Sequence, residues 1–233
     1  MPDYSVPESS VSESSVLARR PVGRRPLLAA LAGLTLPLVL GTPAIAQGAD
    51  QLPLADVMQA GPLGDRSLGK EDAPVTIIEY ASFTCPHCAS FHVNTLPALK
   101  EKYVDSGKVR FIFREFPFDA MATAMSMLTR CAPAERYYPL VDLFFRRQEA
   151  IVSSQKPLDD LLAAARLAGF SQESFEACLK NQSIYDGVNL VKKHGAEKLG
   201  VNSTPTFFIN GKRVSGSRSI EEMEQLLAPL LPK

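Results

Sequence analysis

Residues 75–116 hold a strand pattern, a helical pattern and a second strand pattern in close succession. The two strand segments, APVTIIEYASF and VRFIFREF, are rich in β-branched and aromatic residues, which is typical of strands buried on both faces. Pro86 suits the first residue of the intervening helix, which Pro97 is expected to kink. A strand, a helix and a strand at this spacing predict two parallel strands joined by a right-handed crossover.

The remaining patterns place this unit inside a larger α/β domain. No strand pattern occurs between residues 119 and 199, which are expected to form several helices. In TPTFFINGKRVSG, the Asn210-Gly211 pair favours a type I′ hairpin, and a capping box at Ser219 and Glu222 opens a last helix. We therefore predict a lead-in at residues 47–74 with an edge strand near Ser67-Leu68, an α/β domain at 75–116 and 200–233, and a helical insertion at 117–199.

The N-terminal segment has the pattern of an export signal. Arginine pairs precede the apolar run PLLAALAGLTLPLVLG and a small-residue end at Ala44-Ile45-Ala46. Pro37 interrupts the run, which favours a signal peptide at residues 1–46, cleaved after about Ala46, over a retained anchor. The pair Arg24-Arg25 resembles a twin-arginine signal, and a generic basic region explains it equally well.

Overall charge excludes one class of partner. The chain of 233 residues carries 25 Lys and Arg against 25 Asp and Glu, so no net field favours nucleic acid. It contains four cysteines, and in an exported chain four cysteines favour two disulfides over free thiols or metal ligands.

Cys85 and Cys88 form a Cys-Pro-His-Cys pair with three possible roles. Structural zinc needs four ligands, and the only other histidines are His92 and His194, so we expect no metal and no cofactor. His92 is expected to be a polar residue on a helix face. A purely structural bridge of this spacing would close a very small loop and constrain the unfolded chain little.

A reactive redox couple fits the position of the pair best. At a strand-to-helix junction, the Cys85 thiolate meets unpaired backbone N–H groups and the positive end of the helix dipole. Both lower its pKa, and His87 can add a donor and partial positive charge. Cys88 lies nearly a turn into the helix and is expected to be buried with a higher pKa. We predict Cys85 as the nucleophile and Cys88 as the resolving thiol.

The pair resembles the thioredoxin fold, and its Pro86-His87 dipeptide resembles the DsbA family of periplasmic thiol oxidases. The similarity extends over TIIEYASFTCPHC, the helical insertion and GVNSTPTFFINGKRV. It implies a cis Thr204–Pro205 bond facing the active site, whereas a simple strand-start proline is the alternative. Thr204 departs from the valine of the best-known oxidases and also occurs in isomerases.

The resemblance also implies roles for Glu79 and for the second cysteine pair. Glu79 lies six residues before Cys85, where the family has a buried proton acceptor for the second cysteine of the pair. The resemblance therefore implies this role for Glu79 toward Cys88, and an exposed strand-edge glutamate is the alternative. Lys102 or Arg114 can be its partner, and the sequence does not choose between them. Some alphaproteobacterial DsbA-like proteins carry a second bridge in the insertion, so a structural Cys131–Cys178 disulfide is predicted over two buried free thiols.

Together these features predict a periplasmic thiol:disulfide oxidoreductase that donates its Cys85–Cys88 bond to reduced secreted proteins. The family implies reoxidation by a DsbB-like, quinone-linked membrane oxidase. About 28 residues separate Gln47 from Val75, too few for the dimerisation domain of related isomerases, so a monomer is expected. The alternatives are an isomerase or reductase of the same fold and a non-catalytic holdase chaperone.

Overall fold

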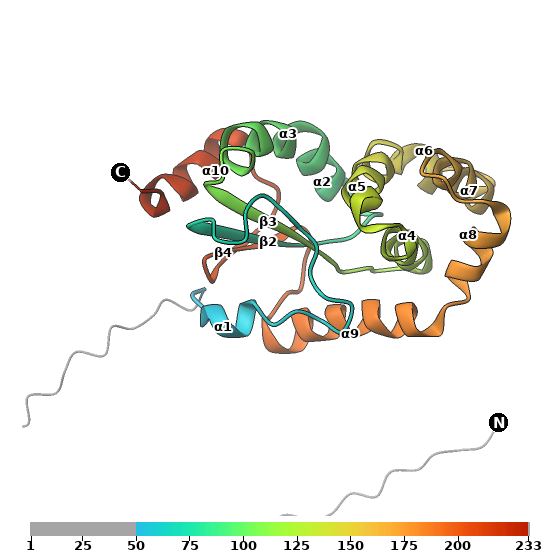
Figure 1. Ribbon diagram of the computed structural model, residues 1–233, viewed down its shortest axis with the longest axis horizontal. Helices are drawn as coiled ribbons and strands as arrows, with labels where there is room; N and C mark the ends of the chain where they lie inside the picture. The colour runs from blue at the N-terminus through green and yellow to red at the C-terminus, as the bar shows by residue number, and fades with distance from the viewer. Residues whose placement is uncertain (1–49, 233) are drawn as a thin grey trace, which may run out of the picture. The chain divides into compact units, whose positions relative to one another are not determined.

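A five-stranded mixed sheet forms the centre of the domain (Figure 1). The computed structural model describes residues 50–232, and the predicted signal peptide lies outside them. The strand order is β1-β3-β2-β4-β5, with parallel pairing between β2 and β3 and antiparallel pairing elsewhere. The strands are β1 (Ser67–Leu68), β2 (Val75–Ala81), β3 (Val109–Glu115), β4 (Thr206–Ile209) and β5 (Lys212–Ser215). The α/β class and the parallel β2–β3 pair are confirmed.

The crossover between β2 and β3 is a continuous helical segment with two wide turns. It consists of α2 (Pro86–Ser90), a π-helical turn η1 (Phe91–Thr95), α3 (Leu96–Leu99) and a second π-helical turn η2 (Lys100–Val104). Pro97 has no N–H to donate to an earlier carbonyl, and a wide turn directly before it absorbs the missing bond. Where the sequence predicts a kink at Pro97, the structure has a π-helical turn just before this residue.

Residues along β2 and β3 alternate between two buried faces of the sheet. Ile77 and Phe113 pack into the larger core beneath α2, α3 and α10 (Ile220–Leu227). Ile78 and Tyr80 pack into the smaller core on the other face, against Val57 of α1 (Leu54–Val57) and Val191 of α9 (Gln182–Lys198). Figure 1 shows α1 and α9 below the sheet and α3 and α10 above it. A side chain on β2 or β3 can therefore contact only groups that lie on its own face of the sheet.

The C-terminal elements follow the predicted turn chemistry. Asn210 and Gly211 have positive φ values of 44° and 88°, which a type I′ turn requires. Asn210 Oδ1 also accepts a hydrogen bond of 2.8 Å from the backbone N–H of Thr76, which ties the hairpin to the start of β2. Ser219 and Glu222 form the predicted capping box of α10.

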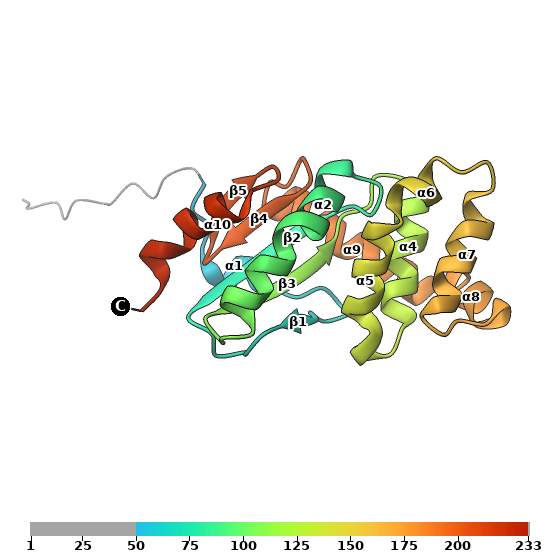
Figure 2. The ribbon, with the colours of Figure 1, turned by 90° about the horizontal axis from the view of Figure 1, so that it is seen from above.

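The helical insertion lies between β3 and β4 and packs beside the sheet (Figure 2). Its helices are α4 (Ala120–Cys131), α5 (Tyr137–Arg146), α6 (Gln148–Val152), α7 (Pro157–Leu167) and α8 (Gln172–Leu179), and α9 returns to the sheet. The pattern over residues 135–151 suggests one helix, but the chain leaves helical geometry at Arg147, with φ −101° and ψ 6°. No helix within residues 50–232 combines the length and apolar character needed to cross a membrane.

A buried ion pair connects the insertion to the sheet. Arg130 of α4 donates hydrogen bonds of 2.6 and 2.8 Å to the carboxylate of Glu115, at the end of β3. Tyr137 of α5 donates a third, of 2.7 Å, to the same carboxylate. The bidentate geometry and the extra donor offset the cost of burying the two charges.

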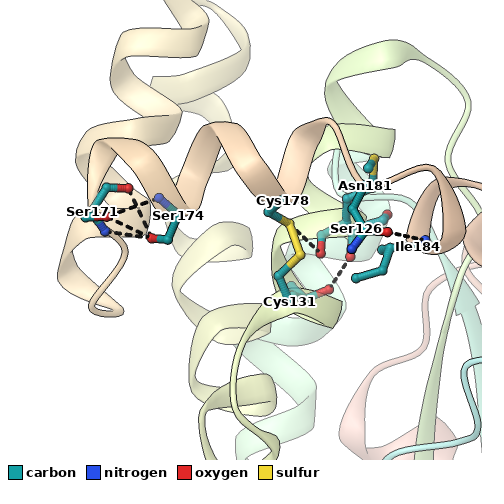
Figure 3. Close-up of a disulfide and its surroundings, with 9 residues drawn as sticks. Ser126, Cys131, Ser171, Ser174, Cys178, Asn181 and Ile184 are labelled. Atoms are coloured by element: carbon teal, nitrogen blue, oxygen red, sulfur yellow. Dashed lines mark hydrogen bonds between the residues drawn. A yellow bond between two sulfur atoms is a disulfide. The ribbon is translucent and has the colours of Figure 1, made fainter.

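A disulfide between Cys131 and Cys178 links α4 to α8 (Figure 3). The two cysteines are separated by 47 positions, and Cys178 is buried against the larger core. The bridge closes a long loop of the helical insertion, which restricts the unfolded chain more than a short loop would.

Removing this bridge should destabilise the protein without changing its fold. Loop entropy predicts that the Cys131→Ala/Cys178→Ala variant loses up to about 4 kcal/mol of unfolding free energy relative to the parent chain. Urea unfolding of both proteins, each with Cys85 and Cys88 reduced, measures this difference. An unchanged unfolding midpoint would contradict a stabilising role for the bridge.

Candidate active site

Cys85 stands at the N-terminal end of α2, where β2 passes into the crossover. Its backbone is extended, with φ −85° and ψ 118°, and Pro86 is the first helical residue. Backbone N–H groups of Cys88 and Ala89 both donate to the Cys85 carbonyl at 3.1 Å. The strand-to-helix junction therefore places the Cys85 side chain at the helix start, as the sequence predicts.

The surroundings of Cys85 favour its thiolate. Its pKa is lowered from 9.0 to about 5, chiefly by a hydrogen bond from the Cys88 side chain. Partial burial opposes this, while the Thr204 side chain and the backbone N–H groups of Cys88 and His87 lower the pKa further. The His87 side chain is exposed, so His87 contributes through its backbone rather than through its ring. Cys85 is the more acidic thiol of the pair.

Cys88 is fully buried and has the opposite tendency. Burial is the main cause that raises the pKa of its thiol, followed by its hydrogen bond to Cys85 and the charge of Glu79. A thiol of high pKa suits the resolving role, because it stays protonated while the Cys85 thiolate reacts first.

The Thr204–Pro205 peptide bond is cis and lies against the redox pair. The Cys85 thiol donates to the Thr204 carbonyl at 3.3 Å, so the loop before β4 faces the start of α2. Ser203, on the same loop, is exposed. The loop thus offers backbone groups beside the more acidic sulfur.

Glu79 is buried in the middle of β2 and bonds to His92 rather than to either cation suggested by the sequence. Glu79 Oε2 and His92 Nε2 are 2.7 Å apart, and the two side chains are 0% and 2% exposed. The interpretation of His92 as a polar residue on a helix surface is therefore wrong: the π-helical turn η1 directs it into the core.

The two cations have other partners. Arg114 lies opposite Tyr80 in the register of β2 and β3, on the other sheet face from Glu79. There it binds Asp65 at 2.8 Å and donates to the Tyr80 hydroxyl at 2.9 Å. Lys102 binds Glu224 of α10 at the surface. Neither reaches Glu79, because strand alternation and helix position direct them elsewhere.

Two contacts that sequence reasoning missed hold the cysteine loop in place. Gln148, the first residue of α6, donates to the backbone carbonyls of Phe83 and Cys85 at 2.7 and 2.9 Å. Thr84 donates to Asp119, the N-cap of α4, at 2.6 Å. Both contacts join segments far apart in sequence, so no local pattern in the sequence predicts them.

A groove beside the cysteines separates α2 from α6. It has a volume of about 580 Å³ and is bordered by Pro86 and Ala89 on one side and by Gln148 and Val152 on the other. The exposed apolar side chain of Val152 lies on this border. An extended or apolar segment can thus lie beside Cys85.

Comparison with known proteins agrees with this geometry. The sequence model of the thioredoxin family matches residues 63–228. The chain is 31% identical over 178 residues to a Rickettsia bellii protein named as a protein-disulfide oxidoreductase, covering 73% of this chain and 67% of the relative. A Rickettsia typhi relative is 33% identical, with 63% of this chain and 55% of the relative covered. The chain thus spans between just over half and two thirds of these relatives.

Among solved structures, the crystal structure of Wolbachia pipientis alpha-DsbA1 is similar to this chain. It has a TM-score of 0.70 and 31% identity, covering 75% of this chain and 94% of that one. The chain therefore belongs to the thioredoxin family, and within it to the DsbA-like protein-disulfide oxidoreductases.

Proposed function

We propose that the chain is a thiol oxidase that donates its Cys85–Cys88 disulfide to reduced secreted proteins. A client thiolate attacks Cys85 Sγ, the Cys85–Cys88 bond breaks, and Cys88 leaves as a thiolate and takes up a proton. A second client thiolate then attacks the client sulfur of the mixed disulfide. Cys85 leaves as a thiolate, and two electrons have passed from client to enzyme.

The acidity of Cys85 is the observation that best supports transfer of the disulfide from the enzyme to the client. Its pKa of about 5 means that the dithiol form holds a stabilised thiolate near neutral pH. The disulfide form has no thiolate to stabilise, so the equilibrium shifts toward reduction of the enzyme and oxidation of the client. The same imbalance supports Cys85, and not Cys88, as the sulfur that forms the mixed disulfide.

Client recognition is assigned to the cis-proline loop. Backbone groups at Ser203 and Thr204 lie beside Cys85 and can pair with an extended client segment, as in strand addition. Cysteine-containing segments of many sequences fit such backbone pairing, because it does not read side chains.

The cellular setting is part of the same proposal. Cleavage after about Ala46 would release a monomeric enzyme into the periplasm, and a DsbB-like, quinone-linked membrane oxidase would restore the Cys85–Cys88 bond. Support comes from the basic and apolar pattern of residues 1–46 and from the family, in which a Bacillus cereus relative of 34% identity is named as a disulfide bond formation protein.

An isomerase or reductase is the second candidate, favoured by threonine before the cis-proline. Against this candidate, Thr204 is buried and its side chain is among the groups that lower the pKa of Cys85, an effect that favours the oxidase. The equilibrium redox potential separates the two candidates.

Trapping tests the mixed disulfide at Cys85. The Cys88→Ala variant, with Cys85 first converted to its mixed disulfide with glutathione, should exchange the glutathione for a client that carries a single thiol. The covalent complexes should accumulate, because no second thiol can resolve them, and mass spectrometry of non-reduced samples detects them. The matched Cys85→Ala/Cys88→Ala variant should form none. Equal yields from both variants would contradict the proposed nucleophile, and no complexes from either would favour a non-catalytic chaperone.

The redox potential tests the direction of transfer. Equilibration with glutathione buffers, followed by alkylation and mass analysis, should place the Cys85–Cys88 couple nearer to the value of about −120 mV known for DsbA than to the value of about −270 mV for thioredoxin. The Cys131→Ala/Cys178→Ala variant ensures that only the active-site pair is measured. A potential near that of thioredoxin would favour a reductase.

A further inference from the structure

The short loop that joins β2 to α2 is held by side chains of the helical insertion. Gln148 of α6 donates from its amide nitrogen to the carbonyls of Phe83 and Cys85 at 2.7 and 2.9 Å. The Thr84 hydroxyl donates to the carboxylate of Asp119, at the start of α4, at 2.6 Å. Each of the three loop residues up to the first cysteine therefore has a polar contact with the insertion.

The Phe83 ring adds an apolar contact with the same part of the molecule. Its centroid lies 4.8 Å from that of Phe145 and 5.8 Å from that of Phe144, and both rings belong to α5. Figure 2 shows α2 beside α5 and α6, and both helices pack against it. Helices α4, α5 and α6 of the insertion therefore all contribute to the position of the loop.

The Gln148 side chain has a single possible orientation at this position. Both of its partners are carbonyl oxygens, so the amide group must present its nitrogen to them, and the two hydrogen atoms of that nitrogen suit two acceptors. Gln148 is 7% exposed, so water competes little for these bonds. A shorter or apolar side chain would leave at least one of the two carbonyls without this donor.

The Cys85 carbonyl is the only hydrogen-bonding group of the peptide that leads into α2. Pro86 has no N–H, so hydrogen bonds can hold this peptide only through its oxygen. The orientation of that oxygen corresponds to the ψ angle of Cys85, which is 118°. The N–H groups of Cys88 and Ala89 donate to it from within the helix at 3.1 Å. Gln148 donates to it from α6, and so links the backbone of Cys85 to the insertion.

The acidity of Cys85 depends on where its sulfur lies, because hydrogen bonds are its main cause. The Cys88 thiol, the Thr204 side chain and the backbone N–H groups of Cys88 and His87 lower its pKa. Hydrogen bonds weaken steeply when their angle or distance departs from the preferred values. A rotation of the Cys85 backbone would therefore move the sulfur away from these donors and raise its pKa.

We propose that the helical insertion sets the reactivity of Cys85 through Gln148 and through the contact between Asp119 and Thr84. Both contacts reach the backbone or the neighbour of the nucleophile and not its sulfur, so Gln148 and Asp119 are positioning residues. Without them the chain keeps its redox pair, but the thiolate loses part of its stabilisation and the disulfide becomes a weaker oxidant. This inference rests on the proposed role of Cys85 as the nucleophile of an oxidase.

Replacement of Gln148 by methionine removes both donated bonds and keeps a side chain of similar length. Cys85 of Gln148→Met should become a roughly tenfold weaker acid, the size of effect that one lost hydrogen bond produces. The potential of the pair should become about 30 mV more negative, since tenfold corresponds to that value for two electrons. The ultraviolet absorbance of the thiolate against pH, with the oxidised protein subtracted, gives the pKa, and glutathione buffers give the potential. A parent-like pKa in the folded variant would overturn the role of Gln148.

Replacement of Thr84 by valine tests the second contact without removing a buried amide. Valine has the shape of threonine and lacks the hydroxyl, and Asp119 keeps its bond to the backbone N–H of Ala122, so α4 keeps its N-cap. Thr84→Val should also make Cys85 a weaker acid, by about threefold or more, which lies within the range for one lost hydrogen bond. Thr84 is half-buried, so this variant decides alone if Gln148→Met does not fold. A parent-like pKa in Thr84→Val would overturn the role of Asp119.

Two controls separate positioning from a general loss of stability. Gln172→Met makes the same substitution at an exposed position of α8 and should leave the pKa of Cys85 and the potential unchanged. Cys131→Ala/Cys178→Ala loosens the insertion and leaves both contacts in place, so it should lower the urea midpoint without changing the pKa. An equal change of pKa in this disulfide variant would show that any loosening is enough and would overturn the proposal. The potential and trapping of the parent chain test the oxidase, whereas only differences from the parent test the positioning contacts.

Discussion

The hydrogen bond between the two thiols at the start of α2 is the interaction on which the site depends. It lowers the pKa of Cys85 and raises that of Cys88, and burial of Cys88 increases the difference between the two pKa values. The βαβ unit makes this imbalance possible, since β2 delivers one sulfur to the helix start while the first helical turn carries the other into the core. The insertion supports the arrangement through Gln148, which holds the carbonyls on both sides of Thr84.

Strand alternation explains why Glu79 contacts His92 and not Arg114. Glu79 and Phe113 share one sheet face with Cys88 and His92, while Tyr80 and the paired Arg114 share the other. A carboxyl group buried among aromatic rings then meets an imidazole instead of a permanent cation. Histidine can give up its proton near neutral pH and arginine cannot.

Much of this architecture follows from local patterns in the sequence. The βαβ unit, the Asn210-Gly211 hairpin and the helix starting at Pro86 depend on neighbouring residues, and each has a strong local signal. The partner of Glu79 does not, because His92 is thirteen positions away and a π-helical turn changes its direction. The bonds from Gln148 to the cysteine loop and from Arg130 to Glu115 join separate elements, so only their three-dimensional packing determines them.

The central claim is that the start of α2 holds Cys85 as a thiolate near neutral pH. The rate of Cys85 alkylation by iodoacetamide in the reduced protein, measured against pH, tests it most directly, because only the thiolate reacts. The lowered pKa predicts that the rate rises through a midpoint near pH 5 and is almost level at pH 7. A midpoint near 9, the value of an unperturbed thiol, would contradict the account.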